Sequence, residues 1–210
     1  MIDPFYLASV PEPRTVLGLR LKPFSLGHVI LLNRIESAFV TGGVPDYNDL
    51  AASVFICALT FEDALASFDD PDRDRVMRLW HDRITGADRW SVRLGWRKPK
   101  LVDLADGCRL FSDYLTEHSK VPKYSFNAED FREMECPQVQ VVKMTLMRDL
   151  HIPEAELLNR SWGLCLWDYV TLKAMKGEVR LYKQEDMDDA LAAAKRLHDR
   201  LNAKEGQCQS

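Results

Sequence analysis

The sequence lacks paired cysteines, since no two of them have Cys-x-x-Cys spacing. The five cysteines are odd in number and widely spread: Cys57, Cys108, Cys136, Cys165 and Cys208. A disulfide framework favours an even, clustered set, so we expect no disulfide-stapled fold. We expect reduced thiols in a cytoplasmic protein. Cys57 and Cys165 should be buried, because both lie within apolar helical patterns.

Long apolar runs are also lacking. The longest stretches, such as residues 29–32 and 54–59, are far shorter than the ~20 residues that a membrane-spanning helix needs. The first five residues contain no basic segment followed by an apolar one, so we expect no secretory signal. The sequence therefore predicts a protein without a membrane partner.

Neither sign of charge dominates, since 32 acidic residues stand against 28 basic ones for a net charge of -4. This balance argues against a polybasic protein that coats DNA, although it leaves room for a local basic patch. Apolar residues make up 46% and charged residues 29%, as in ordinary globular proteins. A chain of 210 residues corresponds to about one domain and is long enough for a substantial core.

Motifs for common catalytic and binding chemistry are missing. No G-x-G-x-x-G, phosphate-binding loop or G-x-S-x-G occurs, so Gly42-Gly43 is interpreted as a turn. The acidic run 69–74 lacks the glycine and spacing of a calcium loop and is interpreted as a helix cap. The histidines stand apart, with no second histidine at i+4: His28, His81, His118, His151 and His198. We therefore expect no catalytic residues, no metal and no cofactor, while convergence of scattered His, Asp and Cys side chains stays open.

Apolar periodicity predicts a mainly α protein, a compact multi-helix domain with one or two short strands or a small hairpin. Alternation over residues 15–22 predicts one short strand, and Ser25 is a suitable N-cap for a helix that runs to about residue 39. A second helix, capped by Asp46 or Asn48, runs to residue 59. Residues 60–63 open a short amphipathic segment. Further helical segments are expected at 71–84, 101–118, 137–147, 154–158, 161–175 and 184–203, a loop or partial helix at 121–135, and a strand at 178–182.

The predicted domain organisation is simple. Prolines in residues 1–14 indicate an extended arm, residues 15–203 form a single helical domain, and residues 204–210 form a frayed tail.

Basic and aromatic residues alternate over residues 89–100. As a strand, this segment would bury one face and present a row of arginines on the other. Such interleaving is typical of grooves that bind single-stranded nucleic acid. Here, however, the tryptophans would point away from the arginines, which favours a structural or protein-contact strand. The candidate anion or nucleic-acid contacts are Arg89, Trp90, Arg93, Trp96, Arg97, Lys98 and Lys100.

The helix predicted over residues 161–175 is the most apolar of the chain. Most of its large side chains follow one stripe, which is typical of a core face, but Trp167 lies about 140° from Trp162 around the helix. We expect one tryptophan in the core and the other facing outward or into a neighbouring subunit, because tryptophan and tyrosine often anchor protein interfaces. The candidate partner-binding residues are Trp162, Leu166, Trp167, Tyr169 and Val170.

Two stretches together carry a family pattern. The first is LRLKPFSLGH at residues 19–28, continuing through 31–32, 37–43 and 49–50; the second runs from 153–156 through 167–169 to 176–178. They resemble small helical proteins encoded in the tail-gene region of long-tailed phages and prophages, of the tail assembly chaperone kind. In those proteins a strand and a PFSLGH-like turn lead into a helix, and a late helix follows a proline–glutamate turn and ends in glycine. This chain differs from the smaller members in its length and in its 86–135 region.

The resemblance implies a function without catalysis. Such proteins hold the aggregation-prone, helical tape-measure protein soluble while the tail tube polymerises around it. We therefore expect a chaperone-like assembly factor in the cytoplasm of a bacterial host, with a tape-measure or tail protein as partner and a homo-oligomer left open. The alternatives are a virion structural or connector protein from the same gene neighbourhood, a nucleic-acid-binding module that uses residues 89–100, and, third, an enzyme.

Overall fold

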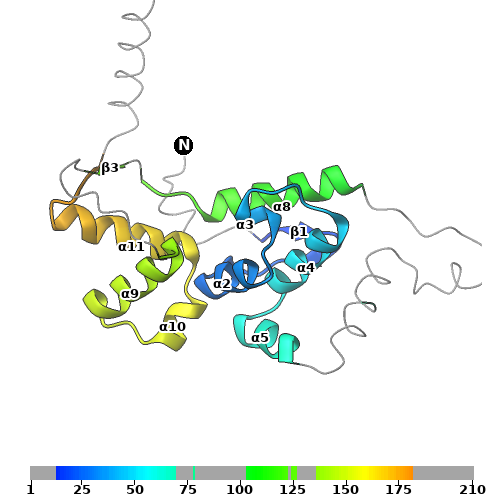
Figure 1. Ribbon diagram of the computed structural model, residues 1–210, viewed down its shortest axis with the longest axis horizontal. Coiled ribbons are helices and arrows are strands. Elements are labelled where there is room, and N and C mark those ends of the chain that lie inside the picture. Colours follow the sequence, from blue (N-terminus) through cyan, green and yellow to red (C-terminus); the bar gives the residue numbers. More distant parts are fainter. Residues whose placement is uncertain (1–12, 70–77, 79–102, 123, 127–135, 182–210) are drawn as a thin grey trace, which may run out of the picture. The chain divides into compact units, whose positions relative to one another are not determined.

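The computed structural model describes residues 13–69, 78, 103–122, 124–126 and 136–181, shown in colour in Figure 1. These residues form eight helices and two two-stranded antiparallel sheets. The expected mainly α fold with short strands is therefore confirmed.

The chain divides into two compact units, residues 1–121 with 134–169 and residues 122–133 with 170–210. The boundaries predicted for the arm, the single domain and the tail stay predictions. The helix expected at 71–84, apart from residue 78, lies outside the described residues. So do the helix expected at 184–203, the basic segment 89–100, residues 1–12 of the arm and the tail 204–210.

The described part of the first unit contains a β-hairpin where one strand over residues 15–22 was expected. β1 (Thr15–Val16) pairs with β2 (Leu19–Arg20), and the chain reverses at Leu17 and Gly18, whose φ angles are 51° and 78°. Two successive positive φ angles are the mark of a type I′ turn, whose twist suits a hairpin. The turn escaped prediction because Leu17 occupies a position where Asn, Asp or Gly is usual.

α2 (Leu26–Arg34) begins after Ser25, as predicted, but ends earlier than residue 39. The chain leaves the helix at Glu36, whose φ of 53° is incompatible with a right-handed helix. The short α3 (Ala38–Thr41) follows and ends at Gly42 in the left-handed conformation. The apolar spacing of the sequence continues across this break, which is why one helix was expected.

Among the described residues, the next three helices each have a polar side chain that accepts a hydrogen bond from a first-turn N–H group. α4 (Tyr47–Ala58) starts at Asp46, not Asn48, and the Asp46 carboxylate accepts a 2.7 Å bond from the N–H of Asp49. α5 (Phe61–Asp69) is the amphipathic segment that residues 60–63 were expected to open. α8 (Leu104–His118) starts at Asp103, whose carboxylate accepts bonds from two first-turn N–H groups. Such caps satisfy N–H groups that have no partner within the helix.

Three later helices confirm the expectations for this part of the chain. α9 (Gln138–Leu150) follows Pro137, α10 (Glu154–Asn159) follows Pro153, and α11 (Trp162–Met175) follows residue 161. A proline at a helix start costs no hydrogen bond, because the N–H groups there lack helical acceptors anyway.

α2 is the helix around which the first unit packs, since it contacts α3, α4, α5, α9 and α10, while α8 packs against α4 and β1. Burying one large apolar side chain stabilises a fold by roughly 1.5–3 kcal/mol, so this shared core holds the helices together. Its fully buried side chains include Leu26, Leu31, Leu32, Leu50, Val54, Phe111, Tyr114, Val142, Leu146 and Leu157.

The described part of the second unit contains a two-stranded sheet. β3 (Tyr124–Phe126) pairs antiparallel with β4 (Val179–Leu181), and Ser125 lies opposite Arg180. The strand expected at 178–182 is confirmed, and Gly177, with a φ of 77°, ends α11 as expected. Residues 124–126 are a strand where a loop or partial helix was expected, because the pairing depends on a segment far away in sequence.

Candidate functional site

The PFSLGH stretch that carries the family resemblance forms the start of α2. The Ser25 hydroxyl accepts a 3.3 Å bond from the N–H of His28, and Nδ1 of His28 accepts a 3.1 Å bond from the N–H of Ser25. This reciprocal pair is a capping box in which histidine replaces the usual Glu or Gln. Nε2 of His28 donates to the Leu59 carbonyl oxygen at 3.1 Å, so both ring nitrogens have a partner.

These contacts require an uncharged His28. Burial lowers its pKa to about 4, against the opposing effects of the Leu59 and Pro23 carbonyl groups and of Glu62. A neutral imidazole accepts at one nitrogen and donates at the other, which matches the two partners here. His28 is therefore a structural part of the helix cap, and neither ring nitrogen is left for chemistry.

The two stretches that carry the resemblance contact each other through their backbones. Ser25 and Ser161 form an antiparallel bridge. The Leu26 N–H donates to the Arg160 carbonyl at 3.1 Å, and the Trp162 N–H donates to the Phe24 carbonyl at 2.8 Å. We call residues 24–28 with 160–162 the junction.

Gly27 allows close packing in the junction. A Cβ atom at this position would overlap the Phe61 ring and lie 2.8 Å from the carbonyl oxygen of Leu158. Neither neighbour can retreat easily, because Phe61 belongs to α5 and the oxygen belongs to the backbone of α10. Close packing therefore explains why the motif has a glycine at position 27.

A cavity of about 580 Å³ opens beside the hairpin. Its walls come from the hairpin and its flanking residues, from the end of α4 and from the end of α8, all in the first unit. Pockets that hold small molecules have volumes of about 300–1,000 Å³, so this cavity has a suitable size. The lining residues are Pro13, Arg20, Leu21, Lys22, Pro23, Ala58 and His118.

Hydrogen bonds fix the hairpin wall of the cavity. The Leu21 N–H donates to the Arg14 carbonyl and the Lys22 N–H donates to the Cys57 carbonyl, both at 2.8 Å. The Tyr114 hydroxyl donates to the Lys22 carbonyl, also at 2.8 Å. Leu21 is buried whereas Arg20 and Lys22 are exposed. The two cations therefore share one side of an extended segment, as a period of two requires.

His118 reaches the cavity from the last turn of α8 and is itself buried. Its Nδ1 lies 2.8 Å from the Tyr114 carbonyl oxygen, so Nδ1 carries a proton and Nε2 is the nitrogen that can gain one. Burial lowers the pKa of His118; Arg14 acts in the same direction, and the Tyr114 carbonyl and Glu117 oppose it. The ring is neutral near pH 7.

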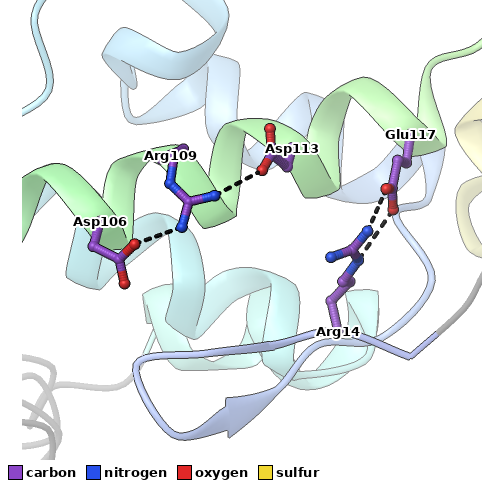
Figure 2. Close-up of polar contacts among 5 residues, drawn as sticks. All are labelled: Arg14, Asp106, Arg109, Asp113 and Glu117. Carbon is purple, nitrogen blue, oxygen red and sulfur yellow. Dashed lines mark hydrogen bonds and ion pairs between the residues drawn. The ribbon is translucent and has the colours of Figure 1, made fainter.

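Charged side chains on α8 form ion pairs, whereas the two cations that line the cavity form none within the described residues. Figure 2 shows the Arg14 guanidinium on both carboxylate oxygens of Glu117, and Arg109 between Asp106 and Asp113. The Arg109 guanidinium lies 2.6 Å from the Asp106 carboxylate and 3.5 Å from that of Asp113. Within the described ranges, no carboxylate pairs with the side chain of Arg20 or Lys22. Among the described residues that line the cavity, two carry a positive charge near pH 7 and none carries a negative one.

The predicted partner-binding residues on α11 differ in burial. Trp162, Leu166 and Tyr169 are each 9% exposed and Val170 is 2% exposed, so these four are core residues within the folded chain. Trp167 is half-buried, and its indole N–H donates to the Lys120 carbonyl at 3.0 Å. The difference between the two tryptophans is the one expected from their offset around the helix. The partner-binding role itself stays a prediction.

The other predicted contact set, residues 89–100, lies outside the described residues. In the part of the chain that the structure does describe, no three His, Cys, Asp or Glu side chains are grouped to hold a metal ion. The described helices include none with the length and apolar character needed to cross a membrane.

The predicted burial of two thiols is confirmed, since Cys57 and Cys165 are fully buried. Burial raises the pKa of both thiols, that of Cys165 to about 12. Both are therefore protonated and weakly nucleophilic near pH 7.

Sequence reasoning missed the cavity and its polar residues. The alternation over residues 15–22 places Arg20 and Lys22 on one side of an extended segment, so their proximity had a local signal. No local pattern indicates that His118 of α8 lies at the cavity, because nearly a hundred residues separate it from the hairpin.

No relative of this chain was found by comparison with known proteins. The sequence matches no protein-family model, and comparisons with curated proteins and with solved structures gave no match. The functional interpretation therefore depends on the arrangement of this chain's own residues and on the motif resemblance.

Proposed function

We propose that this protein is a non-catalytic assembly factor that binds an apolar helical segment of another protein. The observation that supports this best is Trp167, a large aromatic side chain left half-buried on a helix whose other tryptophan lies in the core. Association between proteins draws mainly on apolar burial, and tryptophan is enriched among the residues that dominate it.

The surroundings of Trp167 favour an apolar contact. Its N–H group already has an acceptor in the Lys120 carbonyl, so the polar atom of the ring is satisfied. Leu164, three residues earlier and therefore on a neighbouring part of the helix surface, is also half-buried. Asp168, the next residue in the sequence, has its carboxylate paired with Arg160 at 2.6 Å, which compensates its charge.

α9 exposes further apolar side chains of the first unit. Met144 is 53% exposed and Leu150 is 40% exposed, while Met147, three residues after Met144, is half-buried. Methionine adapts to differently shaped neighbours and is frequent on surfaces that bind varied helices. These side chains support a partner recognised by apolar contact.

The resemblance of the two motif stretches supplies the class of partner. It supports a tape-measure-type or other tail protein of a phage or prophage, bound in the cytoplasm of the bacterial host. Self-association through the same side chains is the second arrangement in this proposal. In either case the protein acts by covering apolar surface and not by chemistry.

Co-expression with the tape-measure protein from the same gene cluster tests the proposal. We expect the soluble fraction of that protein to rise with the wild-type chain and to fall back with Trp167→Ala. Val44→Ala is the matched control, because Val44 is 95% exposed and lies elsewhere in the first unit. Equal insolubility of the tape-measure protein with and without this chain would refute the proposal, as would an equal effect of both variants.

A further inference from the structure

The cavity beside the hairpin has a charge pattern that the assembly function does not use. Arg20 and Lys22 line it without carboxylate partners among the described residues, whereas Glu117, next to His118, already accepts two bonds from Arg14. Two neighbouring cations repel each other, and an anion between them would relieve this repulsion. The charge pattern therefore favours the binding of a negatively charged ligand.

We propose that this cavity binds a small organic anion whose phosphate or carboxylate group lies between Arg20 and Lys22, close to His118. Arginine offers a planar fork of N–H donors that fits either group, and lysine adds a compact positive charge. This site is separate from Trp167 and does not depend on the proposed assembly function.

The remaining walls indicate a ligand larger than a single inorganic ion. Pro13, Leu21, Pro23 and Ala58 contribute apolar atoms, and about 580 Å³ exceeds the space that a lone phosphate fills. The anionic group would meet the cations, and a carbon framework would cover the prolines and the aliphatic side chains. Such a mixture of apolar walls and a few convergent polar groups is typical of small-molecule sites.

The cavity is also built before any ligand arrives. The backbone of Lys22 is held by the Cys57 carbonyl and by the Tyr114 hydroxyl, and that of Leu21 by the Arg14 carbonyl. The Arg14–Glu117 pair joins the chain just before β1 to the last turn of α8. Walls fixed in this way reduce the ordering that binding must otherwise impose.

His118 gives the site a proton-linked component. Its Nδ1–H is held by Tyr114, and the charged groups that act on the ring are Glu117 and its ion-pair partner Arg14. Arg20 and Lys22 line the same cavity. A bound anion adds negative charge beside the ring and favours protonation at Nε2. Protonated His118 then becomes a third donor to the anion.

Calorimetric titration of the full chain with phenyl phosphate and with benzoate tests the proposal. The two probes share an aromatic ring and differ in the anionic group, and sodium chloride keeps the ionic strength constant. Saturable binding of either probe at millimolar concentration supports the site, and the tighter one identifies the preferred group. Absence of binding by both overturns the proposal.

Variants connect the binding to the named residues. Arg20→Gln and Lys22→Gln should each lower the affinity by about tenfold or more, because each removes a hydrogen bond to a charged group. Arg109→Gln is the control, since it removes an equal charge from α8 at a guanidinium already paired with two carboxylates (Figure 2). An equal loss in all three variants would show unspecific attraction and overturn the proposal.

Proton uptake by His118 on ligand binding can be measured separately. Benzoate stays ionised across the neutral range, so buffers of different ionisation enthalpy reveal any proton taken up by the protein on binding. We expect uptake that disappears in His118→Gln. Benzoate binding without proton uptake would contradict the placement of the anion close to His118.

Discussion

The junction and the cavity differ in whether their polar groups have hydrogen-bond partners. The difference is clearest in their two buried histidines, His28 at the junction and His118 at the cavity. At the junction, His28 uses one nitrogen on Ser25 and the other on the Leu59 carbonyl. At the cavity, His118 uses only Nδ1, on the Tyr114 carbonyl, within the hydrogen bonds of the described residues. Equal burial therefore does not mean equal roles, since it is the second nitrogen that separates a structural histidine from one available to a ligand.

The same contrast holds for charge and backbone. Junction residues exchange backbone hydrogen bonds between segments more than a hundred residues apart, which closes the region. Cavity residues point two cations away from the core, with their backbones anchored and their side chains exposed. We infer that the junction maintains the fold and that the cavity contributes little to stability. Four measurements test this inference, and they follow in order from the largest expected effect on stability to the smallest.

The largest effect should come from the junction tryptophan. Trp162→Ala removes a buried ring and should lower the free energy of unfolding by about 3–5 kcal/mol, as measured by chemical denaturation. Trp167→Ala should cost only about 1 kcal/mol, roughly the worth of its bond to the Lys120 carbonyl. Equal losses would mean that both rings are core and that α11 offers no binding face.

Acid should weaken the junction through His28. Its pKa of about 4 in the folded chain lies below the ordinary value of 6.5, so the unfolded chain binds the proton first as the pH falls. Stability should therefore decline from about pH 6.5 downward and lose about 3 kcal/mol from this group by pH 4. The lowered pKa of His118 acts in the same direction.

Unfolding by urea at a series of pH values measures this decline. His28→Gln provides the comparison, because glutamine can still accept from the Ser25 N–H in a capping box but does not titrate. We expect a flatter dependence on pH in that variant between about pH 6.5 and pH 4. A curve parallel to that of the wild-type chain would assign the acid sensitivity to other groups.

Gly27 and Gly107 differ in the atoms that an added Cβ would meet. Gly27→Ala forces a Cβ against the Phe61 ring and the Leu158 oxygen and should cost about 1–3 kcal/mol in thermal or chemical unfolding. Gly107→Ala meets mainly the terminal methyl of Leu50, which can rotate, and alanine favours the helix. Its cost should be smaller, and the reverse order would contradict the packing described here.

The smallest effect should come from the cavity cations. Arg20→Gln and Lys22→Gln, alone or combined, should leave the free energy of unfolding within about 0.5 kcal/mol of the wild-type value, because exposed charges without partners stabilise little. A loss above about 1 kcal/mol in either variant would give these side chains a structural role and remove the contrast with the junction.

Local patterns in the sequence were sufficient for most of the helices in the described residues. Ser25, Asp46 and Gly177 act within one turn of their own position, so their roles can be recognised from adjacent residues. The offset of Trp167 from Trp162 is likewise a property of one helix, and it predicted their unequal burial correctly.

Other features were decided by contacts between distant residues. Arg14 meets Glu117 across 103 positions, and Tyr114 meets Lys22 across 92. The same holds for the strand at 124–126, for the second partner of His28 and for the arrival of His118 at the cavity. A local pattern records which face of an element is apolar but not which element will cover it, and that choice arises only when the helices pack together.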